Sequence, residues 1–325
     1  MQTVVDKISE QQIAEFEEAA IGYLVWYTVP GGCQVTLGDW LALVANTEVS
    51  DMVPRATRAV DAFKQAVARA KGARKFEYAK HGGQIFTYKF LPRDAGFDSE
   101  TYIKALVVEE LDSQRHSLSH ETIVDLIFDR ANERILPPRY HETELAALPE
   151  EIQESVRTRI HRINQEFHAA VRCLNPAKIR TVIQDELKWT QGAVVVREAG
   201  GVYFVPSRSR ARLMALDRFV NALEGPSMHL MPILDTDRQR VMIREAFESE
   251  VTNATDSLMT ELTAVLKGEA GTLTQKRAQG YVEQYQRMHA QMEEYTGILG
   301  SSLSYAETRL SLLHAQVMEM FSHIK

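Results

Sequence analysis

The sequence contains few cysteines and no apolar run long enough to cross a membrane. Cys33 and Cys173 are its two thiols, too few for a disulfide framework or a four-cysteine zinc site. A membrane-spanning helix needs about eighteen consecutive apolar residues, and no such run occurs. The first residues are polar and acidic, unlike the basic and apolar start of a signal sequence. These absences predict a protein of the reducing cytoplasm.

The motifs of common catalytic sites are also missing. The sequence contains no GxxxxGK[ST] phosphate loop, no GxGxxG, no HExxH and no GxSxG. The glycine-rich stretch 80–83 lacks the spacing of a phosphate loop. We therefore expect no cofactor, and the sequence does not indicate an enzyme.

Charge is distributed unevenly along the 325 residues, of which 45% are hydrophobic and 25% charged. That composition is typical of a globular protein of two or three structural units. Residues 155–218 contain twelve Lys or Arg and five Asp or Glu, a net charge of +7, whereas the whole chain carries −7. The remainder is therefore at −14. A basic segment within an acidic chain points to an anionic partner.

Hydrophobic periodicity predicts an α+β fold in three parts. Residues 1–140 form an α+β domain in which helices pack on an open antiparallel sheet. Its expected strands are 22–29, 85–90, 102–111 and 122–128, and its expected helices are 10–18, 36–44 and one opened by Pro54.

Residues 141–225 are predicted to form a basic, winged-helix-like domain. A long helix at 148–173 precedes a second helix at 176–188, opened by Asn175-Pro176. Strands at 193–197 and 202–206 follow, joined by a turn at 198–201 that contains two glycines, and a helix is expected at 210–223. This is the element order of a winged helix.

The basic segment supplies the predicted nucleic-acid contacts. On the second helix, the residues expected to contact phosphate or bases are Lys178, Thr181, Gln184 and Lys188. Arg197 lies near the tip of the hairpin and is expected to contact the backbone. After the second strand, Arg208, Arg210 and Arg212 extend the predicted phosphate contacts. Asp185 and Glu186 oppose this prediction, because carboxylates repel phosphate. The alternative is that these cations are solvated or pair with the acidic remainder of the chain.

Residues 226–325 are predicted to form a long antiparallel helical hairpin resembling a coiled coil. Apolar residues recur at steps of three and four over 243–265 and again over 281–324, with one irregular step near Gly300. The second helix would extend about 75 Å, more than the first can cover. The predicted consequence is self-association into a homo-oligomer through Tyr295, Leu299, Leu303, Leu310, Leu313 and Val317.

Three further groups of residues were considered as sites. His116 and His120 have the spacing of a helical zinc site, but the flanking alternation favours a β-hairpin, so no metal is expected. Tryptophans are expected to anchor the core or a domain junction: Trp26, Trp40 and Trp189. Acidic residues near Lys104 suggest a magnesium-dependent nuclease or, alternatively, a charged sheet edge: Glu109, Glu110, Asp112, Glu121, Asp125 and Asp129.

Two stretches carry a resemblance to a known family. They are Tyr23-Leu-Val-Trp-Tyr-Thr-Val29, with Pro54 and Asp61-Ala-Phe-Lys64, and Val196-Arg-Glu-Ala-Gly-Gly-Val-Tyr-Phe-Val-Pro206. With the helical tail, they resemble an uncharacterised family of bacteriophage and actinobacterial proteins. The resemblance implies a phage-related protein in a bacterial host cell and supplies no activity.

The sequence therefore predicts a non-enzymatic interaction protein. It would self-associate through its C-terminal helices and contact an anionic partner, nucleic acid, through 155–218. One alternative is an inhibitor that docks on a host protein through its acidic N-terminal domain. The other is the metal-dependent nuclease.

Overall fold

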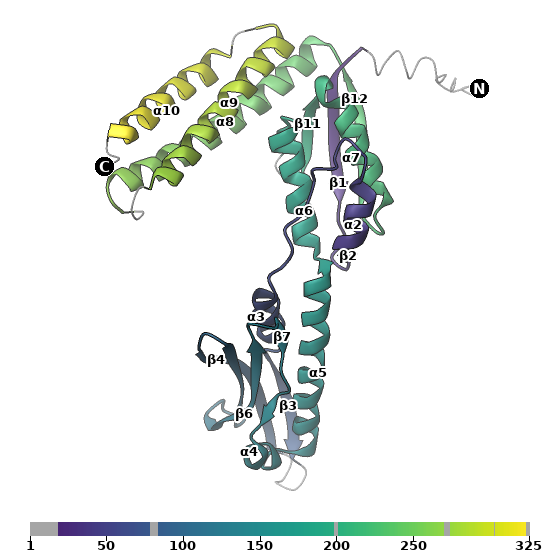
Figure 1. The fold of residues 1–325 in the computed structure, drawn as a ribbon, viewed down its shortest axis with the longest axis vertical. Coiled ribbons are helices and arrows are strands. Elements are labelled where there is room, and N and C mark those ends of the chain that lie inside the picture. The colour runs from purple at the N-terminus through teal and green to yellow at the C-terminus, as the bar shows by residue number, and fades with distance from the viewer. Residues whose placement is uncertain (1–18, 79–83, 198–200, 270–273, 302, 323–325) are drawn as a thin grey trace, which may run out of the picture. The chain divides into compact units, whose positions relative to one another are not determined.

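The chain folds as two compact units. The computed structural model describes residues 19–78, 84–197, 201–269, 274–301 and 303–322. Unit 1 comprises Met1–Cys33, Leu41–Val53 and Pro176–Lys325, and unit 2 comprises Gln34–Trp40 and Pro54–Asn175. Both combine helices with antiparallel strands, which confirms the predicted α+β class (Figure 1). The predicted helix 10–18 and the stretch 80–83 lie outside the described residues, as do residues 198–200 of the predicted turn 198–201.

Unit 2 is built on an antiparallel meander. Successive strands pair with one another in the order β3-β4-β5-β6-β7, and β8 also pairs with β6. The strands are β3 (Gly72–Tyr78), β4 (Gln84–Phe97), β5 (Thr101–Leu111), β6 (Ser117–Asp129), β7 (Arg134–Ile135) and β8 (Arg139–Tyr140). In a separate two-stranded sheet, β2 (Val35–Thr36) pairs with β9 (Cys173–Leu174). Neighbouring strands are adjacent in sequence, so short loops suffice to join them.

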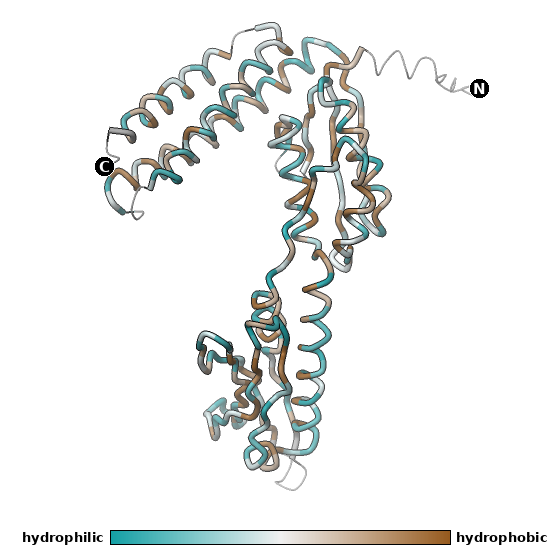
Figure 2. The backbone as a smooth tube through the Cα atoms, in the orientation of Figure 1, coloured by the Kyte–Doolittle hydropathy of each residue, from teal (hydrophilic) through white to brown (hydrophobic). Residues whose placement is uncertain are grey.

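Helices cover one face of that sheet. The amphipathic helix α5 (Glu150–Arg172) buries Ile152, Val156, Ile160, Ile163 and Phe167 against the strands. In Figure 2, hydrophobic residues recur along α5 between hydrophilic ones, as expected for a helix with one buried side. The helix α3 (Ala59–Arg69) contributes Phe63, whose ring stacks on Phe128 with centroids 5.4 Å apart. The short helix α4 (Glu142–Ala146) adds Leu145 to the same core.

Unit 1 contains a second antiparallel sheet, formed from distant parts of the chain. Its strand order is β10-β11-β1-β12, with β1 central between β11 and β12. The strands are β1 (Ala20–Thr28), β10 (Val194–Arg197), β11 (Val202–Pro206) and β12 (Ser227–Leu234). The predicted strand 22–29 and the pair 193–197 and 202–206 therefore share one sheet.

Several helices also belong, wholly or in part, to unit 1. α6 (Pro176–Asp185) is bonded to the residue that follows β1, because the guanidinium of Arg180 donates to the carbonyl of Val29 at 2.8 Å. A π-helix, Glu186–Thr190, extends α6. α7 (Arg210–Ala222) follows a single 3₁₀ turn, Ser207–Ser209. α2 (Leu37–Val44) begins at Thr36, whose hydroxyl accepts the amide of Asp39 at 3.0 Å.

The C-terminal part contains three helices where a two-helix hairpin was predicted. α8 (Asp237–Leu266) matches the first predicted helix, but the second is divided into α9 (Gln275–Leu299) and α10 (Ser304–Ser322). The three helices pack side by side (Figure 1). The prediction of one continuous helix over 281–324 is therefore wrong.

Gly300 is the physical reason for that break. It adopts a left-handed conformation, with φ +61°, and its amide bonds to the carbonyl of Thr296, which ends α9. Arg240 of α8 donates to the carbonyl of Leu299 at 2.6 Å, and Arg244 donates to the hydroxyl of Ser301 at 2.7 Å. The irregular apolar step near Gly300 thus marks a corner that α8 holds in place.

Two further expectations differ from the structure. Pro54 does not open a helix, because α3 starts at Ala59, after an extended segment that ends at Arg58. The range 141–225 does not form one compact body, since α5 belongs to unit 2 whereas α6, β10 and β11 belong to unit 1. The hairpin β10–β11 continues through β1 into a larger sheet.

Gly22 is expected to be essential to the unit 1 sheet. A Cβ atom there would lie 2.4 Å from the carbonyl oxygen of Val205 and 2.5 Å from the ring of Phe204. Gly22→Ala should therefore lower the free energy of unfolding by more than about 2 kcal/mol, measured by urea denaturation.

Gly280→Ala is the matched control, because a Cβ there meets nothing within 4 Å inside α9. This substitution should raise stability by roughly 0.5–1 kcal/mol. Equal effects of the two substitutions would contradict the proposed close packing at Gly22.

Candidate nucleic-acid interface

Three cations of the predicted interface form ion pairs within unit 1. Arg212 bonds to Glu186 and also to Asp51. Arg208 pairs with Glu294 of α9. The ammonium of Lys188 lies 3.3 Å from the carboxylate of Glu250 on α8. Because the partners are distant in sequence, the pattern of neighbouring residues does not predict these ion pairs.

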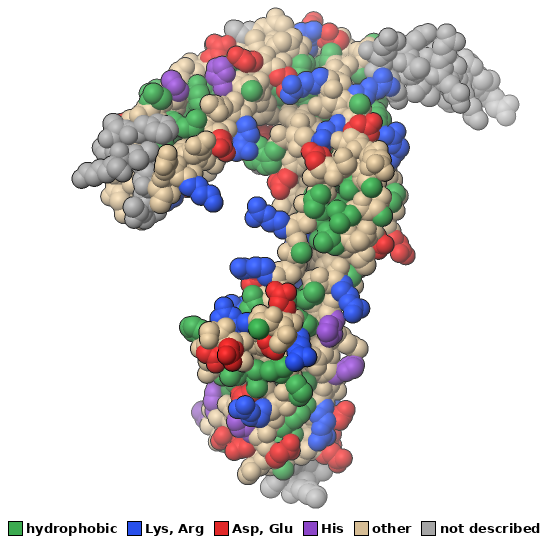
Figure 3. All heavy atoms as spheres, in the orientation of Figure 1, with side chains coloured by type: hydrophobic (Ala, Val, Ile, Leu, Met, Phe, Trp, Pro, Cys, Tyr) green, Lys and Arg blue, Asp and Glu red, His purple; other side chains and the backbone are tan. Residues whose placement is uncertain are grey.

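The remaining predicted residues lie on α6, at the end of β10 and at the start of α7. Thr181 and Gln184 are exposed on α6, and the amide of Gln184 donates to the hydroxyl of Tyr203 at 3.4 Å. Partial burial lowers the pKa of Lys178. Arg197 and Arg210 are exposed. Three of the eight predicted residues are therefore engaged by carboxylates, and Figure 3 shows basic and acidic side chains interspersed on the visible face.

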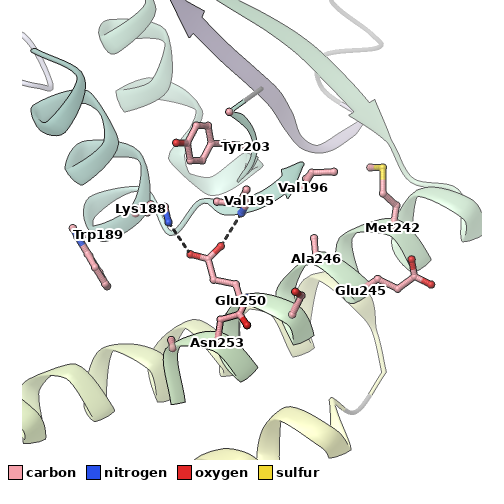
Figure 4. A pocket seen from close by; sticks show the side chains of 13 residues that line it. Lys188, Trp189, Val195, Val196, Tyr203, Met242, Glu245, Ala246, Glu250 and Asn253 are labelled. Atoms are coloured by element: carbon pink, nitrogen blue, oxygen red, sulfur yellow. Dashed lines mark hydrogen bonds and ion pairs between the residues drawn. The ribbon is translucent and has the colours of Figure 1, made fainter. Parts of the chain in front are cut away.

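A groove in unit 1 nevertheless brings part of the basic segment together with other elements. It has a volume of about 730 Å³ and lies between the π-helix, β10 and α8 (Figure 4). Its lining includes Lys188 and Trp189 on one side, Val195 and Val196 of β10, and Glu250 of α8. A groove of this size can hold a ligand as large as a nucleotide.

The π-helix that carries Lys188 and Trp189 is fixed by a buried carboxylate. Glu186 is 3% exposed and accepts two hydrogen bonds from Arg212, at 2.5 and 2.8 Å. Gln191 donates a third bond to the same carboxylate at 2.9 Å. The bonds to Glu186 are the main reason that the pKa of Arg212 is raised. Glu186 and Arg212 are therefore structural partners that hold this segment.

Trp189 is 58% exposed at this groove, so the prediction that it anchors the core or a junction is wrong. The guanidinium of Arg287, from α9, lies over its ring, 5.2 Å from the centroid. Trp40, by contrast, is fully buried. The helical spacing after Ile179 and Ile183 predicts Leu187, not Trp189, on the buried side.

Glu250 closes one side of the groove at the outer edge of β10. Its carboxylate accepts the backbone amide of Val195 at 2.7 Å and pairs with Lys188 through the other oxygen. Figure 4 shows this side chain reaching from α8 towards both partners. Because β10 is an edge strand, Glu250 satisfies an amide that would otherwise face solvent.

The turn after the π-helix is attached to α9. Gly192 has φ +67°, and its carbonyl accepts hydrogen bonds from the hydroxyl of Tyr295 at 2.9 Å and from the amide of Gln291 at 3.2 Å. Glu294 lies beside this turn, and burial raises the pKa of its carboxyl to about 6 although Arg208 acts in the opposite direction. α9 thus contacts both the turn, through Tyr295 and Gln291, and Trp189, through Arg287.

The acidic residues considered for a nuclease are bonded to separate partners. Glu109 pairs with Lys89, and Lys104 pairs with Asp94. Asp125 bonds to His141, and Asp112 caps a turn and bonds to His116. Among the residues that the structure describes, no group of three His, Cys, Asp or Glu is placed to hold a metal ion. The arrangement therefore offers no support for the nuclease alternative.

The residues predicted to mediate self-association lie inside unit 1. All belong to one hydrophobic core with α8 and are at most 2% exposed: Tyr295, Leu299, Leu303, Leu310, Leu313 and Val317. The break at Gly300 lets α10 fold back so that the chain covers its own apolar seam. The physical reason for expecting copies to join through these side chains is therefore lost.

The fold and the groove define an α+β protein with an open groove whose lining includes Lys188 and an exposed indole. The chain belongs to the family described as "Family of unknown function (DUF6744)", which matches residues 20–325. A search of curated proteins and a search of solved structures each found no match. Within the described part of the chain, no helix is long and apolar enough to cross a membrane.

Loss of Arg212 should destabilise unit 1 strongly. Arg212→Met leaves the buried Glu186 carboxylate without its guanidinium, which should cost about 3 kcal/mol of unfolding free energy. Arg218→Met, in the same helix, removes a pair at 3.7 Å whose arginine side chain is 70% exposed, and should cost less than about 1 kcal/mol. Chemical denaturation measures both, and equal losses would refute the structural role of Arg212.

Glu294 should make stability fall as pH rises towards neutrality. Because its pKa is about 6 in the folded state and lower in the unfolded chain, the folded state binds the proton more tightly, and unfolding is favoured as pH rises through about 6. Glu294→Gln should abolish this decrease, which amounts to up to about 2 kcal/mol of the free energy of unfolding. Urea denaturation at several pH values measures it. The control is Glu283→Gln, on the exposed side of α9, and an unchanged pH profile in Glu294→Gln would contradict the assignment.

Proposed function

We propose that the protein is a non-enzymatic interaction protein that contacts nucleic acid through cations around the groove of unit 1. The observation that supports this proposal is that basic residues from three elements belong to the groove lining or neighbour one of its residues. Lys188 lines the groove from the π-helix, Arg287 approaches from α9, and Arg197 directly follows the lining residue Val196 on β10. Phosphate groups bind such clusters irrespective of sequence.

The ion pairs of the groove set the expected strength of binding. A phosphate that reaches Lys188 competes with the carboxylate of Glu250. Arg197 and Arg287 are exposed to solvent. We therefore expect weak, salt-dependent affinity in the range of non-specific binding, with a dissociation constant of about 10⁻⁴–10⁻⁶ M.

A winged-helix-like use of α6 is a finer version of the same proposal. In it, α6 adds Lys178, Thr181 and Gln184 to the contact surface, and Arg210 extends the phosphate track. The exposure of Thr181 and Gln184 supports this version. A phage-related setting in a bacterial cell is proposed on the resemblance of the sequence alone. Self-association is not part of the proposal, because its predicted residues are buried within unit 1.

Salt and charge reversal test the proposal directly. With about three phosphate contacts, affinity for a labelled DNA strand should fall roughly 20-fold between about 50 and 200 mM salt. The double variant Arg197→Glu, Arg287→Glu should bind at least about tenfold more weakly, measured by fluorescence anisotropy.

Lys276→Glu is the matched control, since Lys276 is exposed at the start of α9 and outside the groove lining. It should leave affinity nearly unchanged. Binding that is indifferent to salt and to the double reversal would remove the nucleic-acid proposal and favour a protein partner instead.

A further inference from the structure

The exposed indole of Trp189 is the feature of the groove that phosphate binding does not use. A tryptophan buried in a core contributes strongly to stability, yet this side chain remains 58% exposed. It is carried by a π-helix, a rare form that is frequent at functional sites. The buried bonds of Glu186 fix that π-helix, so the indole is held at a defined place on the surface.

We infer that Trp189 is a stacking platform for an unpaired base, so that the groove binds single-stranded rather than duplex nucleic acid. This inference rests on the proposed nucleic-acid binding and specifies its ligand. Sequence-tolerant single-strand sites combine a cationic track with aromatic rings on which bases stack. Here Arg287 supplies a cation over the ring, and Lys188, which precedes Trp189 in the chain, also lines the groove.

Arg287 shows that a planar group can approach the indole face. Its guanidinium lies 5.2 Å from the ring centroid, a cation–π arrangement between side chains of different elements. Arg287 is exposed, so its side chain can move aside or stack on the opposite face of an incoming base. A base in that position lies between a ring and a guanidinium plane, both of which favour stacking.

Polar side chains near the indole match the edges of a base. Asn253 lines the groove from α8, and Gln284 and Gln291 lie with Trp189 around the adjoining hollow against α9. Amide side chains donate and accept hydrogen bonds, so they suit any base edge. In a duplex those edges are paired and the base faces are stacked, so Trp189 could reach neither.

The carboxylates of the groove do not cancel the attraction for a strand. Glu250 pairs with Lys188 and accepts the amide of Val195, so this pair carries no net charge and the attraction depends on Arg287 and Arg197. Glu245 is exposed and lines the groove from α8, whereas Trp189 lines it from the π-helix. The strand is therefore expected to pass on the side of Trp189, Arg287 and Arg197, where the phosphates meet cations.

Three probes test the stacking inference. They are an oligothymidylate of about 15 nucleotides, an abasic phosphodiester strand of the same length and a blunt duplex. Anisotropy and quenching of tryptophan fluorescence at low salt measure binding. The oligothymidylate should bind at least about tenfold more tightly than the abasic strand and more tightly than the duplex. Trp189→Leu should remove this advantage while leaving the abasic strand unaffected, and Trp189→Phe should retain most of it.

The outcomes distinguish base stacking on Trp189 from the phosphate binding proposed above. Equal binding of the oligothymidylate and the abasic strand, with no effect of Trp189→Leu, overturns the stacking inference and leaves phosphate binding in place. Duplex binding as tight as that of the oligothymidylate also overturns it. If none of the probes binds, the proposed function fails together with the inference. Because Trp189 is exposed, both variants should unfold at nearly the wild-type temperature, and thermal denaturation checks that they are folded.

Discussion

The buried carboxylate of Glu186 is the constraint on which the groove depends. A charge that is 3% exposed persists only if it is paired and hydrogen-bonded. Arg212 and Gln191 provide those bonds, and they come from α7 and from the turn after the π-helix. Lys188 and Trp189 follow Glu186 within the same π-helix. The position of the groove's cation and indole is therefore a consequence of satisfying one buried charge.

α8 and α9 contribute to the core and to the groove at the same time. Phe247 of α8 stacks on Tyr295 of α9 with centroids 4.5 Å apart, and both rings are buried. Three residues further along α8, Glu250 faces the groove, and the hydroxyl of Tyr295 holds the carbonyl of Gly192. The apolar seam that the sequence displays so regularly thus supports a polar site. This dual role explains why the seam is closed inside the chain.

Local features of the sequence predicted much of the secondary structure. The helix α5 and the Asn175-Pro176 start of α6 lie close to their predicted ranges, and the alternation over 85–90 falls within β4, because each pattern depends on neighbouring residues. Non-local pairing was not predictable in this way. β1 joins β11 and β12, which lie about two hundred residues away along the chain. Gly300 was noticed only as an irregular step, although its left-handed backbone ends a helix.

The candidate site was predictable only in part, for the same reason. Composition correctly located an excess of basic residues, but not which of them would meet carboxylates. Arg208 pairs with Glu294, and Lys188 pairs with Glu250, partners more than sixty positions away in sequence. The exposure of Trp189 and the approach of Arg287 depend on how α9 packs against the π-helix turn. Only tertiary structure could reveal that combination.

Hydrogen–deuterium exchange with and without a saturating oligothymidylate tests the central claim most directly, because it maps the contact on the intact chain. The account predicts slower exchange at the π-helix and β10, over 186–197, and on the facing part of α9 near Arg287. Protection confined to unit 2, or absent from 186–197 while the strand is bound, would contradict it.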